Sequence, residues 1–108
     1  MRVLLTGGAG FIGSNLAHAL VSAGHDVTVL DKLTYTGNRA NLNGLDLDFV
    51  DGDICDFTLV KRLVKDREVV INMAAESHVT RSFHGASEFI KTNVNGARIV
   101  VRAAVDAN

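Results

Sequence analysis

The sequence predicts an α/β domain, an open and doubly wound parallel sheet with helices on both faces. Short apolar runs alternate with amphipathic segments along the chain, and a glycine cluster separates the first run from the first helical segment. The apolar runs have no polar face, which is typical of parallel strands covered by helices on both sides. With four such strands we expect the order 3-2-1-4.

The first half of the chain reads as a strand, a helix and a second strand. Residues 3–5 and 27–30 are short runs rich in Val and Leu. Between them, apolar residues recur at helical spacing over residues 11–23, and Gly24 stands where a helix C-cap is expected. A connection of this kind makes the two strands parallel.

The second half continues the alternation. Residues 32–46 are polar and predict a long loop with room for one helical turn. Strands are expected at residues 47–50 and 69–73, with a short amphipathic helix at 57–65 between them. A long helix should run from residue 90 to the last residue, and its core face is expected to carry Ile90, Val94, Ala97, Val101 and Ala104.

Composition narrows the classes of function. The chain has 108 residues, 47% of them hydrophobic, and a formal net charge of −1 with Lys and Arg spread along the sequence. One globular core is therefore expected, without a basic patch for nucleic acid and without a membrane-binding face. The apolar run at the start is too short for a signal peptide or a membrane span, so we expect a cytoplasmic protein with small-molecule partners.

No metal site and no hydrolase site are predicted. Cys55 is the only cysteine, which fits a reducing compartment, and a small buried apolar role is expected for it. The acids between residues 46 and 56 do not follow the calcium-loop register. Ser77 and His78 are adjacent on an extended segment and would point in opposite directions. The histidines lack the spacing of metal ligands: His18, His25, His78 and His84.

The stretch from residue 6 to residue 14 places four glycines between the first strand and the first helix. Gly8, Gly10 and Gly13 have the GxGxxG spacing of a dinucleotide-binding turn. We expect a side chain at Gly8 or Gly10 to occupy the space of a pyrophosphate, which the N–H groups at the helix start would bind. Gly13 would let the helix lie close to the strand.

An acidic residue, Asp31, ends the second strand, about 20 residues beyond the glycine turn as a dinucleotide site requires. Its carboxylate would bind the ribose hydroxyls of adenosine and repel a 2′-phosphate, which favours NAD over NADP. Lys32 and Arg39 weaken this preference, because either cation could reach a phosphate.

Four stretches together resemble the dTDP-glucose 4,6-dehydratases, a family of the extended short-chain dehydrogenases. They are TGGAGFIG from Thr6, DKLTYTGN from Asp31, GDICD from Gly52 and AAESHVTRS from Ala74. The resemblance covers essentially the whole chain and implies a Rossmann-type, NAD-binding domain. The family has Asp where this chain has Thr80, which leaves another nucleotide sugar open as the substrate.

The resemblance also implies a site. Phe11 and Ile12 would give N–H groups to the pyrophosphate, Asp53 and Ile54 would recognise adenine, and Ser77 would contact the sugar nucleotide. The cofactor-binding residues expected in this way are Gly7, Gly10, Phe11, Ile12, Gly13, Asp31, Lys32, Leu33, Thr34, Asp53, Ile54, Met73, Ala74, Ala75, Glu76 and Thr92.

The implied reaction takes a hydride from sugar C4, eliminates water across C5 and C6, and returns the hydride to C6. The family uses a Tyr-x-x-x-Lys pair for this, but the only tyrosine here is Tyr35, followed four residues later by Arg39. We therefore expect no catalytic residue in this chain. Residues 1–108 would be the N-terminal part of an NAD-binding Rossmann domain, without the catalytic segment and the substrate domain.

The fourth strand supports the same expectation. Residues 69–71 are apolar, as in a strand with neighbours on both sides, but in the order 3-2-1-4 they would lie at an exposed sheet edge. The resemblance further implies a homodimer formed through the outer face of the long last helix. Two other functions stay open: an NAD-dependent nucleotide-sugar epimerase, and a dinucleotide-binding module without catalysis.

Overall fold

The computed structural model describes residues 1–33, 37–75 and 90–107. Four parallel strands form one sheet in the order β3-β2-β1-β4, as the sequence predicts. The central strand β1 lies between β2 and β4, and Leu5 is paired with Val29 on one side and Ile71 on the other. The strands are β1 (Arg2–Thr6), β2 (Asp26–Asp31), β3 (Asp48–Asp51) and β4 (Val69–Asn72).

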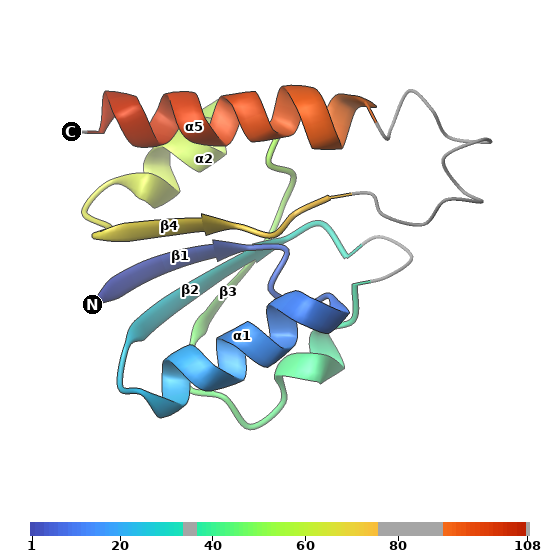
Figure 1. Ribbon diagram of the computed structural model, residues 1–108, viewed down its shortest axis with the longest axis vertical. Helices are drawn as coiled ribbons and strands as arrows, with labels where there is room; N and C mark the ends of the chain where they lie inside the picture. Colours follow the sequence, from blue (N-terminus) through green and yellow to red (C-terminus); the bar gives the residue numbers. More distant parts are fainter. Residues whose placement is uncertain (34–36, 76–89, 108) are drawn as a thin grey trace.

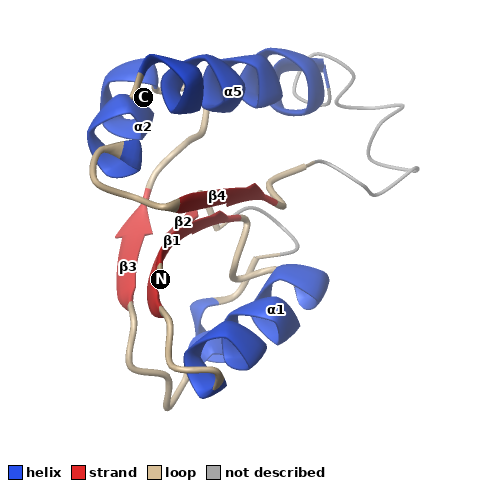
Figure 2. Cartoon of the chain, turned by 60° about the vertical axis from the view of Figure 1, so that its left-hand side comes forward, coloured by secondary structure: helices blue, strands red, loops and turns tan. Residues whose placement is uncertain are grey.

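Helices cover both faces of the sheet (Figures 1 and 2). On one face lie α1 (Phe11–Ser22) and the short 3-10 helix η1 (Arg39–Leu42). On the other face, α2 (Phe57–Val64) packs beside α5 (Ala97–Asp106), which continues from the π-helical turn η2 (Lys91–Gly96). The predicted doubly wound arrangement is therefore confirmed.

Alternation along the strands builds a separate core on each face. Leu4 and Leu30 point toward α2 and α5 and pack with Val100. Their neighbours in sequence, Leu5 and Val29, point the opposite way and pack in the α1 core. Because both faces are apolar, each strand reads as a continuous hydrophobic run.

The predicted core face of the last helix is wrong. Val100 and Ala103 are buried against the sheet, whereas Val94 and Val101 are 58% and 62% exposed. Apolar residues lie on two sides of this helix, so periodicity could not distinguish them. The small residues Gly96 and Ala103 are buried and let the helix approach the rest of the domain. This packing determines which side of the helix is buried.

In the first helix, too, the buried side carries small residues and a large apolar residue is exposed. Gly13, Ser14 and Ala17 are buried, while Ile12, which fits the apolar spacing, is 65% exposed. The small side chains let α1 lie close to the strands. Ile12 is left on the side of the helix start that faces a pocket.

Candidate functional site

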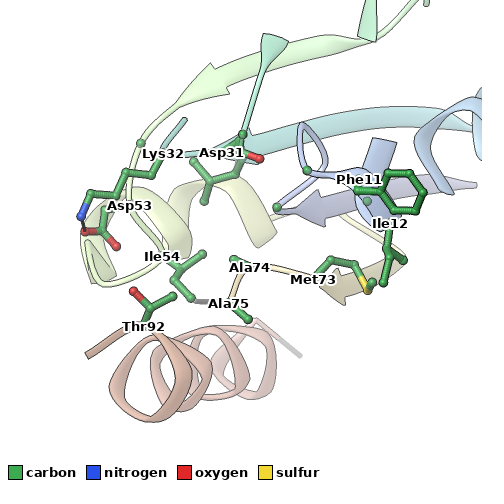
Figure 3. Close-up of a pocket in the computed structure, with 16 residues that line it drawn as sticks. Phe11, Ile12, Asp31, Lys32, Asp53, Ile54, Met73, Ala74, Ala75 and Thr92 are labelled. Atoms are coloured by element: carbon green, nitrogen blue, oxygen red, sulfur yellow. Dashed lines mark ion pairs between the residues drawn. The ribbon is translucent and has the colours of Figure 1, made fainter. Parts of the chain in front are cut away.

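A pocket of about 530 Å³ lies beyond the carboxyl ends of the strands, beside the start of α1 (Figure 3). Its position corresponds to the point where the chain connections turn from one side of β1 to the other, the usual ligand site of an open α/β sheet. The volume is within the range of small-molecule and cofactor sites.

Most of the predicted cofactor residues line this one pocket. Leu33 is not among them, because its side chain packs with the α1 core. Thr34, Glu76 and Ser77 lie outside the described residues, as does Tyr35. The predicted residues in the lining are Gly7, Gly10, Phe11, Ile12, Gly13, Asp31, Lys32, Asp53, Ile54, Met73, Ala74, Ala75 and Thr92.

Three further lining residues were not predicted. Leu30 lies one position before the acid that ends β2, and Gly37 and Gly52 lie in the loops after β2 and β3. A Cβ at Gly37 would lie 2.9 Å from Asp31 Oδ1. The loop glycines were visible in the sequence, but only the fold shows that they approach the pocket.

Two glycines allow the turn after β1 to be compact. Gly7 has φ +70°, and a Cβ there would lie 2.6 Å from the backbone of Met73 and Ala74. A Cβ at Gly13 would collide with the carbonyl oxygen of Gly7. The end of β4 and the start of α1 can therefore both approach the turn, as expected for Gly13 from its spacing.

The role predicted for Gly8 is wrong. A Cβ at Gly8 would lie 2.7 Å from the Val29 side chain, so this glycine serves packing against the sheet and does not face the pocket. At Gly10, a Cβ would meet only Gly7 O, at 3.5 Å, and this residue lines the pocket. The glycines of the turn that line the pocket are thus Gly7, Gly10 and Gly13, which are three residues apart.

The start of α1 offers donors to an anion. The first intrahelical bond of this turn is Ser14 N to Gly10 O at 2.9 Å, so the N–H groups of Phe11, Ile12 and Gly13 have no acceptor in the helix. Gly10 provides no side-chain cap, and the first turn has no acidic residue. No acidic side chain of the helix itself offsets the partial positive charge of about +0.5 at the helix start, which fits a phosphate group.

Asp31 is buried, with 9% of its surface exposed, and joins the turn to the loop after β2. Its Oδ2 accepts a hydrogen bond from Ala9 N at 2.8 Å, and its Oδ1 accepts one from Leu33 N at 2.7 Å. A carboxylate accepts about four hydrogen bonds. Asp31 can therefore hold the turn and still accept hydroxyl groups from the pocket.

A second set of contacts holds Ala9 at its carbonyl oxygen. Ala9 O accepts hydrogen bonds from Asn38 N at 3.1 Å and from Asn41 Nδ2 at 2.9 Å. Both asparagines belong to the segment around η1, and sequence reasoning missed them. Asparagine is frequent in loops for many reasons, so its presence alone carried no signal of this contact.

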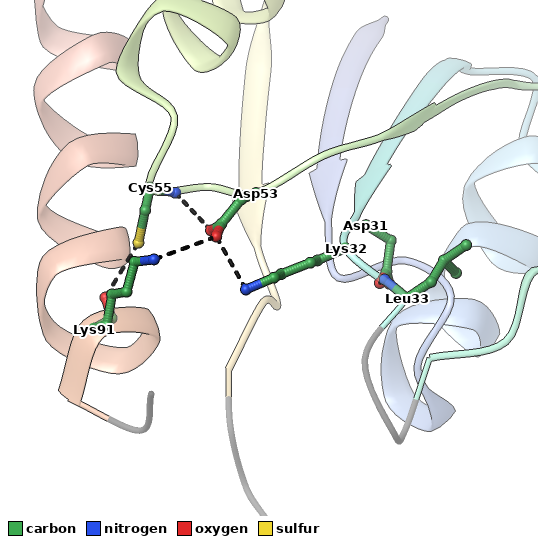
Figure 4. Close-up of polar contacts among 6 residues, drawn as sticks. All are labelled: Asp31, Lys32, Leu33, Asp53, Cys55 and Lys91. Atoms are coloured by element: carbon green, nitrogen blue, oxygen red, sulfur yellow. Dashed lines mark hydrogen bonds and ion pairs between the residues drawn. The ribbon is translucent and has the colours of Figure 1, made fainter. Parts of the chain in front are cut away.

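The other end of the pocket is a charged cluster around Asp53 (Figure 4). Asp53 Oδ1 accepts a hydrogen bond from Cys55 N at 2.9 Å, and Oδ2 lies 3.2 Å from Lys32 Nζ and 4.0 Å from Lys91 Nζ. Partial burial raises the pKa of Asp53, but the bond from Cys55 N and the Lys32 ammonium outweigh it. The pKa therefore lies below its usual value, and the carboxylate is charged at neutral pH.

Cys55 differs from its predicted role as a buried apolar side chain. It is partly exposed, and its Sγ donates a hydrogen bond to Lys91 O at 3.3 Å. Burial, followed by the negative charge of Asp53, raises the pKa of the thiol. The thiol thus stays protonated at neutral pH and connects the loop after β3 with the start of the last helix.

Close packing between that loop and the last helix completes this wall. A Cβ at Gly96 would collide with the Ile54 side chain, so the glycine allows Ile54 to lie against the helix. Thr92 lies on the π-helical turn before it and lines the pocket. Short π-helical turns occur frequently at functional sites.

The two cations that could have favoured NADP are held by other partners. Lys32 forms the ion pair with Asp53, and the Arg39 guanidinium lies over the Phe49 ring, 4.7 Å from its centroid. Within the described ranges, no group of three His, Cys, Asp or Glu residues could hold a metal ion. No helix in these same ranges is long and apolar enough to cross a membrane.

Residues 3–108 match the family described as the NAD dependent epimerase/dehydratase family. The chain belongs to this family. The predicted cofactor is the one that the family's description names. The relatives and solved structures below confirm the fold and the resemblance to the dehydratases.

Several relatives of this chain are known. It is 53% identical to a low-salt glycan biosynthesis protein, Agl12, of Haloferax volcanii, covering all of this chain and 36% of that protein. It is 46% identical to a dTDP-glucose 4,6-dehydratase of Streptomyces niveus, covering 96% of this chain and 34% of that one. The chain thus spans about a third of the length of these relatives.

Solved structures show the same fold. DesIV, a dTDP-glucose 4,6-dehydratase of Streptomyces venezuelae with NAD and TYD bound, superposes with a TM-score of 0.93 and 48% identity, over 99% of this chain and 36% of that one. A UDP-glucose 4-epimerase of Thermotoga maritima superposes with a TM-score of 0.91 and 33% identity, over 100% and 35%.

Proposed function

We propose that this chain is the NAD-binding part of a nucleotide-sugar 4,6-dehydratase that converts dTDP-glucose to dTDP-4-keto-6-deoxyglucose. The proposal rests on one observation: a single pocket has the N–H groups of the α1 start, without a side-chain cap, at one end and the charged Asp53 carboxylate at the other. The 46% identity to a named dTDP-glucose 4,6-dehydratase supports the choice of reaction.

In this proposal each part of the pocket binds one part of NAD. The N–H groups of Phe11 and Ile12 bind the pyrophosphate, and Asp31 uses its remaining acceptor positions for the adenosine ribose. Asp53 accepts a hydrogen bond from the adenine amino group beside Ile54. Residues 73–75 and Thr92 form the wall between the end of β4 and the last helix.

NAD is proposed over NADP because the buried Asp31 carboxylate would face a 2′-phosphate. When bound, NAD would take up a hydride from sugar C4 and return it to C6. The residues of this chain bind and orient the cofactor.

We place the catalytic tyrosine and lysine, and the residues that bind the sugar nucleotide beyond Ser77, outside residues 1–108. This chain would then be the N-terminal part of the cofactor domain. Its relatives are about three times as long. Within the described residues β4 has only β1 as a neighbour, although its Val69, Val70 and Ile71 are apolar and half-buried.

The test uses the full polypeptide that contains this chain. We expect calorimetry to show NAD binding, and incubation with dTDP-glucose to yield the 4-keto-6-deoxy product. Binding of NAD without that product would contradict the proposed dehydratase function. Absence of NAD binding would contradict the proposed cofactor site as well.

An epimerase is the second candidate. The superposition on the UDP-glucose 4-epimerase, at 33% identity, favours it. An epimerase returns the hydride to C4, so a product that differs from the substrate only at C4 would identify it. NAD binding with neither product would favour a binding module without catalysis.

We further propose a cytoplasmic homodimer formed through the last helix. Ile90, Val94, Val101 and Val105 are all more than half exposed, and their spacing places them along one side of this helix. A second copy of the helix would cover this stripe. We expect Val101→Glu to shift the full polypeptide from dimer to monomer in analytical ultracentrifugation, and an unchanged dimer would contradict the proposed interface.

A further inference from the structure

Lys32 immediately follows the acid that is proposed to bind the ribose. A cation near that acid is the usual means by which a dinucleotide site accommodates a 2′-phosphate. The side chain of Lys32 nevertheless extends from the end of β2 toward Asp53, away from Asp31 (Figure 4). Its Nζ lies 3.2 Å from Asp53 Oδ2.

Asp53 is well placed to hold this ammonium group. The hydrogen bond from Cys55 N to Oδ1 fixes the orientation of the carboxylate, and only 26% of the side chain is exposed. Lys91 approaches Oδ2 from the side of the last helix, opposite Lys32, at 4.0 Å. The carboxylate therefore has a fixed position between two cations that come from different elements.

We infer that Asp53 determines cofactor specificity, because it binds the Lys32 ammonium and so withholds that charge from the 2′-phosphate of NADP. This inference rests on the proposed NAD site and adds a second role to Asp53. Asp31 repels the phosphate directly, while Asp53 removes the cation that would offset the repulsion. The other nearby cation, Arg39, is held over Phe49.

The test measures the dissociation constants of NAD and NADP by calorimetry on the full polypeptide. Asp53→Asn removes the charge but keeps an oxygen for the hydrogen bond from Cys55 N. We expect the ratio of the NADP to the NAD dissociation constant to fall about fivefold, the value of a partly exposed ion pair. The ratio cancels any lost contact with adenine, since both cofactors contain adenine.

Two double variants test which lysine causes the change in the ratio. Asp53→Asn with Lys32→Met should return the ratio to its original value. Asp53→Asn with Lys91→Met should keep the fivefold change, because Lys91 lies on the far side of Asp53 from Asp31. Asp106→Asn is the matched control: it removes one negative charge that is paired with Arg102 at 3.1 Å on the last helix, and it should leave the ratio unchanged.

The outcomes separate the inference from the proposed function. If Asp53→Asn binds NAD with an unchanged ratio, or if Lys32→Met does not reverse the change, the inference fails and the NAD site stands. If the unaltered protein binds neither cofactor, both fail. Should Asp53→Asn not fold, Asp53→Ser, whose hydroxyl can also accept from Cys55 N, provides the same comparison.

Discussion

The two ends of the pocket are built in different ways. At the helix start, hydrogen bonds hold the turn, and none of the cations in the described residues takes part: the buried Asp31 carboxylate accepts from Ala9 N, and Asn41 Nδ2 donates to Ala9 O in a partly buried bond. At the other end, Asp53 is held by half-exposed lysines. Buried hydrogen bonds to a carboxylate are costly to remove, whereas exposed ion pairs contribute little to stability. The end at the helix start therefore determines the conformation of the turn, whereas the end at Asp53 determines the charge of the pocket wall.

The largest expected effect concerns the shape of the turn. Gly7→Ala should lower the free energy of unfolding by about 3 kcal/mol or more, because it combines a positive φ with a collision against Met73 and Ala74. Gly24→Ala is the control, since Gly24 has φ +89° with no atom within 4 Å of its Cβ, and it should cost about 1 kcal/mol. Equal losses in denaturant unfolding would show that the collision is relieved easily.

A direct comparison of the two ends exchanges each acid for its amide. Asp31→Asn should lower the free energy of unfolding by about 2 kcal/mol, because one of the two N–H groups that it binds, the buried Ala9 N or the partly buried Leu33 N, loses its acceptor. Asp53→Asn should cost less than about 1 kcal/mol, since it removes only half-exposed ion pairs. Denaturant unfolding measures both, and similar losses would contradict the proposed difference between the ends.

The second contact with Ala9 should have a smaller effect. Asn41→Asp replaces the donor to Ala9 O with a carboxylate, which should cost about 1 kcal/mol and weaken NAD binding severalfold. Asn43→Asp adds the same charge to an exposed residue nearby and is the matched control. Calorimetry would contradict the role of Asn41 if both variants bound NAD equally.

The smallest effect is the pH dependence of the charged end. The pKa of Asp53 lies below its usual value of 3.8, so its contribution to stability is present above that value and is lost as the pH falls through the lower folded-state pKa. A carboxyl NMR titration should show this low midpoint, and Lys32→Met should raise it. The same midpoint in both proteins would show that the Lys32 ion pair does not hold the carboxylate in its charged form.

Local sequence patterns determined much of this protein. The strands, the helices and their order could be predicted because continuous apolar runs and helical spacing are properties of neighbouring residues. Gly13 and Asp31 were placed correctly around the pocket, since their separation matches that of a strand, a turn and a helix. The family resemblance added Asp53 and Thr92, which lie far from the glycine turn in sequence.

Only the tertiary structure decided which of several equivalent residues faces which neighbour. Gly7 and Gly8 are adjacent glycines, and the approach of β4 and of Val29 assigns one to the pocket and the other to the core. Val100 and Val101 fit a helix equally well, and packing against the sheet buries the first. Lys32 could extend toward a phosphate or toward Asp53, and the loop after β3 provides the partner. Each of these choices depends on contacts between residues distant in sequence, which no local pattern records.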